Sequence, residues 1–131
     1  MGVWDELTAE QYTVMINAVE EAYLNGVVYE YNRRVNGQVK VGDVLVARPI
    51  SEDTVRSLIP RFAGVVADLL AMGWIEIREP HNGVWDEAAV MTEAEIASAL
   101  ADPDTWISHV DGDNRMVMLM TTDRWDQLVS G

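Results

Sequence analysis

Residues 50–77 read ISEDTVRSLIPRFAGVVADLLAMGWIEI, and most of what can be expected of the fold follows from this stretch. Ser51 and the two acids after it are typical of a helix start, because serine caps backbone N–H groups and acids favour the positive end of the helix dipole. Pro60 predicts either a kink or a junction between two helices. Gly73 ends the helix, and residues 74–78 alternate as a strand does. Apolar residues at helical spacing predict the core-facing stripe: Val55, Leu58, Ile59, Phe62, Val65, Val66, Leu69 and Leu70.

The residues before this stretch predict a helix followed by a hairpin. Thr8 and Gln11 match a capping box, and apolar residues at helical spacing follow, so we expect a helix over about 8–25. Residues 27–34 are rich in β-prone side chains, and Asn36-Gly37 is a typical hairpin turn. These features predict a hairpin of 27–34 with 38–46. The alternative is that 42–47 forms a short helix.

The residues after the stretch predict a helix, two strands and a closing helix. Thr92 and Glu95 match a second capping box, which predicts a helix as far as about Ala101. Residues 106–110 and 115–120 predict two strands joined by a turn, and a last helix opens at Thr122. The pentapeptide Gly-Val-Trp-Asp-Glu occurs at 2–6 and again at 83–87, and we expect each tryptophan to pack on the helix that follows.

Length and composition predict one domain spanning residues 1–131. No motif in the sequence identifies a reaction, so we expect a protein without enzymatic activity. Cysteine is absent, which excludes disulfides, thiolate zinc sites and thiol nucleophiles. The acidic N-terminus has no apolar segment typical of a signal peptide, and no apolar run is long enough to span a membrane, so we expect a cytoplasmic protein. No Gly-rich phosphate loop or serine elbow is present, and we expect neither cofactor nor metal.

Two histidines and two aspartates are the candidate ligands for a divalent metal ion. His81 and His109 stand far apart, and their spacing matches no zinc motif. The residues from Asp111 to Asn114 are explained as a turn. An EF-hand loop would need a ligand where Arg115 stands.

The stretch 50–77 resembles the core of winged helix-turn-helix proteins. The residues that carry the resemblance are Ser51-Glu52-Asp53-Thr54-Val55 and Asp68-Leu69-Leu70-Ala71-Met72-Gly73-Trp74-Ile75, and residues 118–122 are similar to the second wing strand running into a closing helix. The resemblance implies an α+β fold of winged-helix type, with three to four helices, a small antiparallel sheet and an elaborated wing containing residues 80–114. It also implies a protein of transcription regulation in which Arg56 and Arg61 lie on the helix presented to DNA.

The charge distribution provides the candidate binding residues. The chain carries nine Lys/Arg against 22 Asp/Glu, a net charge of −13, yet six of the nine cations lie between residues 33 and 61. A local basic face on an acidic protein could contact DNA phosphates or guanine edges. The candidate DNA-binding residues are Arg33, Arg34, Lys40, Arg48, Arg56 and Arg61.

Three other uses of the same charges stay open. In the first, the arginines simply pair with the many carboxylates, which leaves no basic face. A homodimer could join basic and acidic faces. The acidic surface could instead make the chain a protein-interaction module that binds a basic partner or imitates DNA.

Overall fold

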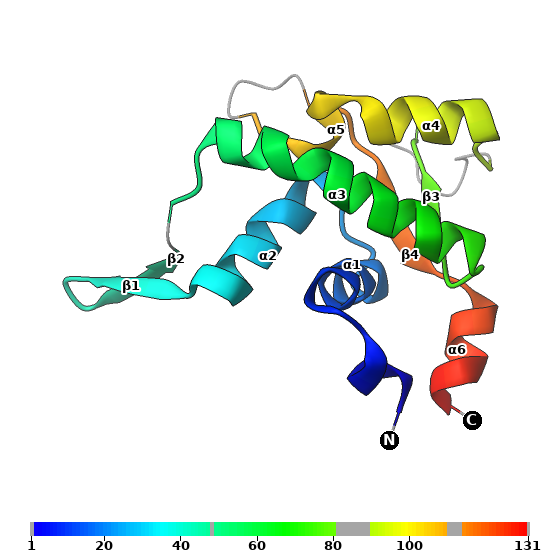
Figure 1. Cartoon of the computed structure of the whole chain (residues 1–131), viewed down its shortest axis with the longest axis horizontal. Helices are drawn as coiled ribbons and strands as arrows, with labels where there is room; N and C mark the ends of the chain where they lie inside the picture. The colour runs from blue at the N-terminus through cyan, green and yellow to red at the C-terminus, as the bar shows by residue number, and fades with distance from the viewer. Residues whose placement is uncertain (1, 48, 81–89, 110–113, 131) are drawn as a thin grey trace.

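The computed structural model describes residues 2–47, 49–80, 90–109 and 114–130. The chain is α+β, as predicted, and its described part contains six α-helices and two small antiparallel sheets (Figure 1). In chain order the elements are η1 (Val3–Glu6), α1 (Ala9–Val19), η2 (Leu24–Gly26), α2 (Val27–Asn36), β1 (Gln38–Val41), β2 (Val44–Ala47), α3 (Glu52–Ala71), β3 (Ile75–Arg78), α4 (Glu93–Ala101), α5 (Pro103–Trp106), β4 (Met118–Thr121) and α6 (Asp123–Ser130).

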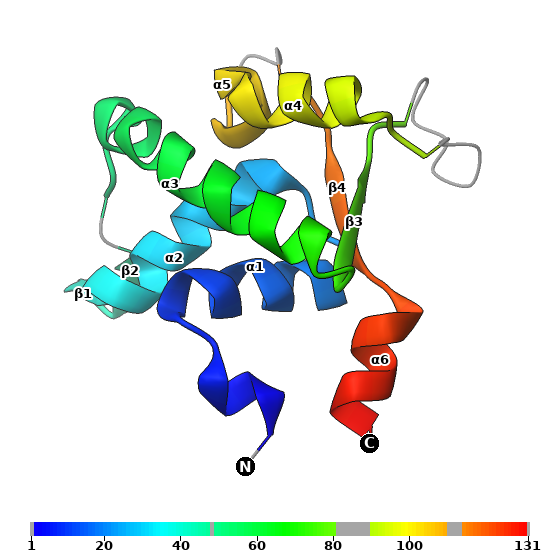
Figure 2. The ribbon, with the colours of Figure 1, turned by 45° about the vertical axis from the view of Figure 1, so that its right-hand side comes forward.

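The first three α-helices pack against one another and enclose one side of the core (Figure 2). The N-termini of α1 and α3 are capped as the sequence predicts: the Thr8 hydroxyl accepts from the Gln11 N–H, and Ser51 Oγ accepts from the Thr54 N–H. The helix α3 continues through Pro60 as one element rather than two. Its stripe is buried at Val55, Ile59, Phe62, Val66 and Leu69.

A small sheet covers the other side of this core. The strands β3 and β4 are antiparallel, with Ile75 opposite Thr121 and Arg78 opposite Met118. On the far edge of β4, Tyr23 forms an antiparallel bridge with Met118, and the Leu24 N–H donates to the Val117 carbonyl at 2.9 Å. The segment between α1 and α2 therefore extends the sheet, an arrangement consistent with a winged-helix-like α+β fold.

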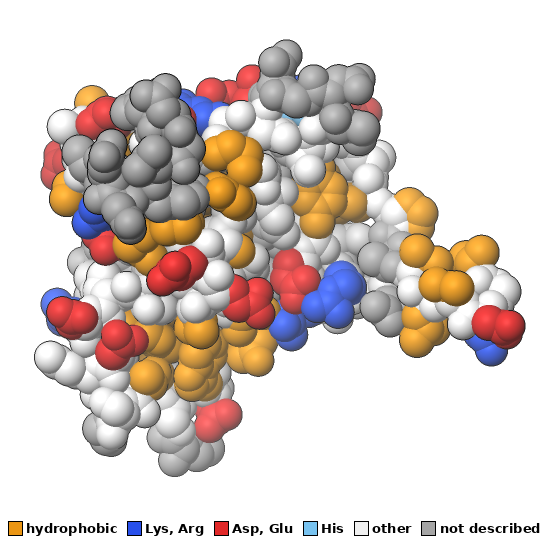
Figure 3. Space-filling model, turned by 180° about the vertical axis from the view of Figure 1, so that it is seen from behind, with side chains coloured by type: hydrophobic (Ala, Val, Ile, Leu, Met, Phe, Trp, Pro, Cys, Tyr) orange, Lys and Arg blue, Asp and Glu red, His pale blue; other side chains and the backbone are white. Residues whose placement is uncertain are grey.

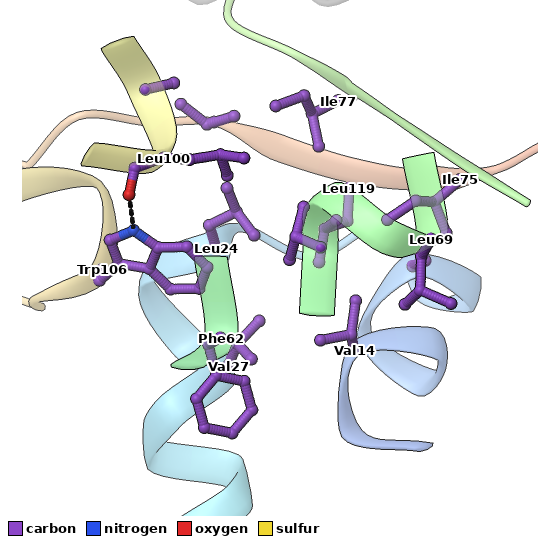
Figure 4. Packing of buried hydrophobic residues seen from close by; sticks show 14 of the residues in the cluster. Val14, Leu24, Val27, Phe62, Leu69, Ile75, Ile77, Leu100, Trp106 and Leu119 are labelled. Carbon is purple, nitrogen blue, oxygen red and sulfur yellow. Dashed lines mark hydrogen bonds between the residues drawn. The ribbon is translucent and has the colours of Figure 1, made fainter. Parts of the chain in front are cut away.

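The segment between β3 and β4 contributes α4 and α5 and closes the top of the core. Trp106 is fully buried, and its indole N–H donates to the Leu100 carbonyl at 3.0 Å (Figure 4). The core cluster that contains Trp106 also includes residues from α2, α3 and the sheet, among them Val27, Phe62 and Leu119. The capping box predicted at Thr92 is present, and α4 ends at the expected Ala101.

The hairpin predicted for 27–34 with 38–46 is wrong in its first half. Residues 27–36 form α2, because Val27 and Val28 are buried in the core together with Asn32 on one helical face. Tertiary burial here outweighs the strand preference of valine and tyrosine. Gly37, at φ +74, ends this helix rather than turning a hairpin.

The hairpin that does form is shorter and lies within 38–47. Its register places Gln38 opposite Ala47 and Val41 opposite Val44, so 42–47 is not helical. Gly42, at φ +63, occupies the first central position of the two-residue loop, as a type II′ turn requires.

Two further boundaries differ from the expectation. The first helix ends at Val19 rather than near residue 25, because the next residues pair with β4. Trp106 closes α5, and residues 107–109 are not a strand as predicted for 106–110.

The second pentapeptide copy at 83–87 and most of the turn at 111–114 lie outside the described residues. In the first copy, Trp4 packs edge-on against Tyr12 of α1 with ring centroids 5.5 Å apart, which confirms its predicted role.

Candidate functional site

The two arginines on α2 share one carboxylate. Arg33 and Arg34 lie in the last turn, and both bind Glu30, at 2.6 Å and 3.1 Å. The Arg33 hydrogen bond, with the charges of both arginines, lowers the pKa of Glu30 despite its partial burial. Glu30 in turn raises the pKa of Arg33. These cations are therefore part of a local ion-pair group on α2.

Arg61 of α3 forms an ion pair with Glu10 of α1, and its guanidinium lies 5.8 Å from the centre of the Tyr31 ring on α2. The Tyr31 hydroxyl donates to the same Glu10 carboxylate at 3.1 Å. Burial opposes ionisation of Glu10, but hydrogen bonds, including that from Tyr31, and the Arg61 charge leave its pKa lowered. Burial and the Glu10 carboxylate raise the pKa of Tyr31. The contacts among Glu10, Tyr31 and Arg61 thus connect α1, α2 and α3.

The remaining candidates are spread over the molecule. Arg56 binds Glu52 at 3.4 Å, and because Arg61 comes five residues after Arg56, the two arginines lie about 140° apart around α3. Lys40 is exposed on β1, and Arg48 lies outside the described residues. The structure places Arg34 over the Tyr12 ring and Arg61 over the Tyr31 ring, and it does not gather the described candidates into one basic face. Pairing with carboxylates holds for Arg33, Arg34, Arg56 and Arg61.

A feature that the charge pattern did not predict is the β1–β2 arm, defined as residues 38–47. It projects from the body of the molecule (Figure 1), and hydrophobic side chains gather on it (Figure 3). The register pairs Val41 with Val44, so these side chains share one face with Val46, while Lys40 and Leu45 share the other. The exposed fractions are 62% for Val41, 64% for Val44, 65% for Leu45 and 43% for Val46.

The sequence did contain a pattern that could have located this arm. Valines alternate through 39–41 and 44–46 around Gly42-Asp43, which is itself a suitable two-residue turn. The predicted hairpin placed its turn at Asn36-Gly37 instead, because Asn-Gly has the stronger preference for such turns.

A second apolar feature is the α1 groove, defined by residues of η1 and α1: Trp4, Asp5, Tyr12, Ile16, Val19 and Glu20. Its volume is about 510 Å³. Trp4 is held at the end of the groove by edge-on contacts with Tyr12 and Trp125. Val19 remains 54% exposed, and Arg34 lies 5.1 Å from the Tyr12 ring centre. The groove is thus lined by two aromatic rings and by the acids Asp5 and Glu20, and a cation lies near Tyr12.

A third, polar cleft of about 680 Å³ lies where β3, α5 and the segment before β4 meet. Arg115 donates to Glu79 at 2.7 and 2.9 Å and to Asp102 at 3.3 Å, and these carboxylates raise the pKa of Arg115. His109 and Asp104 are 3.0 Å apart at the same cleft. Among the residues that the structure describes, no group of three or more His, Cys, Asp or Glu is placed to hold a metal ion. The cleft is organised by internal ion pairs.

Within the described ranges, no helix has both the length and the apolar character required to cross a membrane. No protein-family model matches the chain, and no curated protein and no solved structure matches it either.

Proposed function

We propose that this chain is a non-enzymatic protein-interaction module that binds another polypeptide through the β1–β2 arm. The observation that carries the proposal is the exposure of four aliphatic side chains on a projecting two-stranded ribbon. A two-stranded ribbon is only marginally stable in water by itself, and exposed apolar patches mark interaction sites. Covering Val41 and Val44 with a partner would stabilise both the ribbon and the complex.

The charge of the body supports the same function. At a net charge of −13, the protein attracts basic polypeptides and repels acidic ones at long range. The described arginines of the sequence-predicted basic window are largely neutralised by Glu10, Glu30 and Glu52. An acidic protein that offers an apolar arm is suited to a protein partner more than to a phosphate backbone.

The test compares three forms of the protein as bait in an extract of its own cells. The Val41→Thr/Val44→Thr variant keeps the β-branched shape of the arm and removes its apolar character. Val90→Thr makes the same chemical change at a site that is 74% exposed and away from the arm. The proposal is supported by a protein that the wild type and Val90→Thr retain and that the arm variant does not. Once purified, that protein must bind the wild type again. Equal retention by all three forms would overturn it.

A second candidate function is DNA binding of the winged-helix type. The order α1, a sheet-edge segment, α2, α3, β3 and β4 supports it, because a winged helix presents its third helix to DNA with a two-stranded wing beside it. In this version α3 contacts DNA through Arg56 and Arg61, with Arg33 and Arg34 approaching phosphates from the side. The carboxylates that now hold these arginines would have to release them.

The DNA candidate is tested by fluorescence anisotropy with a duplex of random sequence, from low to physiological salt. We expect salt-sensitive binding that disappears in Arg56→Ala/Arg61→Ala. The matched variant Glu10→Gln/Glu52→Gln keeps both arginines, removes their partners and should bind more tightly. Absence of binding at low salt in every form would overturn autonomous DNA binding.

A further inference from the structure

The sulfur chemistry of this protein belongs to methionine, because the sequence contains seven methionines and no cysteine. Six of the seven lie in the part of the chain that the structure describes, and five of these are buried or half-buried: Met15, Met72, Met91, Met118 and Met120. The sixth, Met116, is 37% exposed. Oxidation of a methionine depends on access to its sulfur, so Met116 is the described methionine that an oxidant in solution reaches first.

Met116 is also held in a defined place. It stands two residues before β4, beside the segment that joins α1 to α2, where the Leu24 N–H donates to the Val117 carbonyl at 2.9 Å. Next to this backbone contact, Asn25 Nδ2 donates to Met116 Sδ at 3.5 Å. The fold therefore aims a hydrogen-bond donor at the most exposed sulfur of the described chain.

We propose that Met116 is a site of reversible oxidation, at which hydrogen peroxide converts the thioether to a sulfoxide whose oxygen accepts from Asn25. A lone pair of the sulfur attacks one peroxide oxygen, so that an S–O bond forms and the O–O bond breaks. The departing hydroxide takes the proton of the transferred oxygen and leaves as water. Sulfur loses two electrons and the peroxide gains them. Methionine sulfoxide reductases reverse the change.

The surroundings of Met116 favour a neutral oxidant. Met116 lines the polar cleft, together with the acids Glu79, Asp102 and Asp104 and the single cation Arg115. Three carboxylates against one guanidinium give this part of the cleft a negative potential, which repels anions. Hydrogen peroxide carries no charge and is small, so it enters a cleft of about 680 Å³ without opposition.

The sulfoxide strengthens a contact that is weak in the reduced protein. A thioether sulfur is a weak acceptor, whereas oxidation makes the side chain polar and supplies an oxygen that accepts from an amide N–H. Because Met116 is partly exposed, the new oxygen does not enter the core. Oxidation therefore ties η2 more firmly to the segment before β4. At the fully buried Met15 the same change would disrupt packing instead.

The first test treats the folded wild type with dilute hydrogen peroxide and locates the added oxygen by fragment mass spectrometry. Among the described methionines, we expect one oxygen on Met116 before any on Met72 or Met120. Met116→Leu should lose this early product, and Met120→Leu, the same change at a half-buried position, should keep it. Earlier oxidation at another described methionine, or equal oxidation at all of them, would overturn the site. An oxygen that a methionine sulfoxide reductase cannot remove would overturn reversibility.

The second test measures the part played by Asn25. The midpoint temperature of thermal unfolding is compared before and after oxidation of Met116 in the wild type and in Asn25→Ala. Oxidation should raise the midpoint of the wild type, because the sulfoxide oxygen gains the Asn25 donor, and it should not raise that of Asn25→Ala. The same change in both proteins would overturn the contact between Asn25 and the sulfoxide.

Discussion

Arg61 on α3 forms an ion pair with Glu10 on α1, although the two residues stand 51 positions apart in the chain. The Tyr31 hydroxyl on α2 donates to the same carboxylate, so one acid links three helices. The cation of this pair, Arg61, is one of the residues that the charge distribution predicts to bind DNA. Arg61 is therefore both a candidate DNA-binding residue and part of a contact between helices.

The first prediction concerns Glu10→Gln. The substitution removes the charge that Arg61 pairs with but keeps an acceptor for Tyr31, so the free energy of unfolding should fall by about 0.5–1 kcal/mol. Glu6→Gln makes the same change at an exposed position of η1 and should fall within about 0.5 kcal/mol of the wild type. Urea denaturation of both variants measures the difference. An equal effect at both sites would show that the Glu10 network does not contribute.

The second prediction concerns acid sensitivity. The Arg33 hydrogen bond is the main cause that lowers the pKa of Glu30 below the ordinary glutamate value of 4.5, and the pKa of Glu10 is lowered as well. The stabilisation is therefore fully present above the unfolded-state pKa and is lost as the pH falls through the folded-state pKa. Glu30→Gln should flatten the decline in unfolding free energy below pH 4.5. An unchanged pH profile, measured by urea denaturation at each pH, would contradict this assignment.

The third prediction pairs two glycines. Gly64 lies in the middle of α3, where an added Cβ meets no atom within 4 Å, so Gly64→Ala should stabilise the protein by about 0.5–1 kcal/mol. Gly37 has φ +74 and ψ −157, a conformation almost restricted to glycine, and Gly37→Ala should cost about 1–3 kcal/mol. Compared with the wild type, Gly64→Ala should raise the midpoint temperature of thermal unfolding and Gly37→Ala should lower it. Shifts of the same sign would contradict the backbone argument.

The fourth prediction concerns Trp106→Phe. The change leaves the Leu100 carbonyl without its indole donor and opens space in the core, at a cost of about 2–3 kcal/mol. Trp4→Phe provides the comparison, because Trp4 is only half-buried at the surface. Guanidinium denaturation should show the larger loss for Trp106→Phe. A larger loss at Trp4 would mean that the segment between β3 and β4 contributes little to the core.

Elements that depend on short-range patterns could be predicted from the sequence. The cap side chains of Thr8, Ser51 and Thr92 accept hydrogen bonds as predicted, since each cap and the N–H group that donates to it stand three residues apart. The stripe of α3 and the strand at 75–78 follow from periodicity alone. Residues 27–36 could not be predicted in this way, because Val27 and Val28 prefer strands locally but are buried on a helix by contacts with distant elements.

The candidate site divides along the same line. The sequence by itself determined the acidic balance, the α+β class, the helix starts and the clustering of six cations between residues 33 and 61. Only the tertiary structure decided that Glu10 pairs with Arg61 and that Arg56 lies on another side of α3 from Arg61. It also decided that Val41 and Val44 are exposed on the arm. The physical reason is range: caps and periodicity act over a few residues, whereas ion pairing and exposure depend on how distant segments pack.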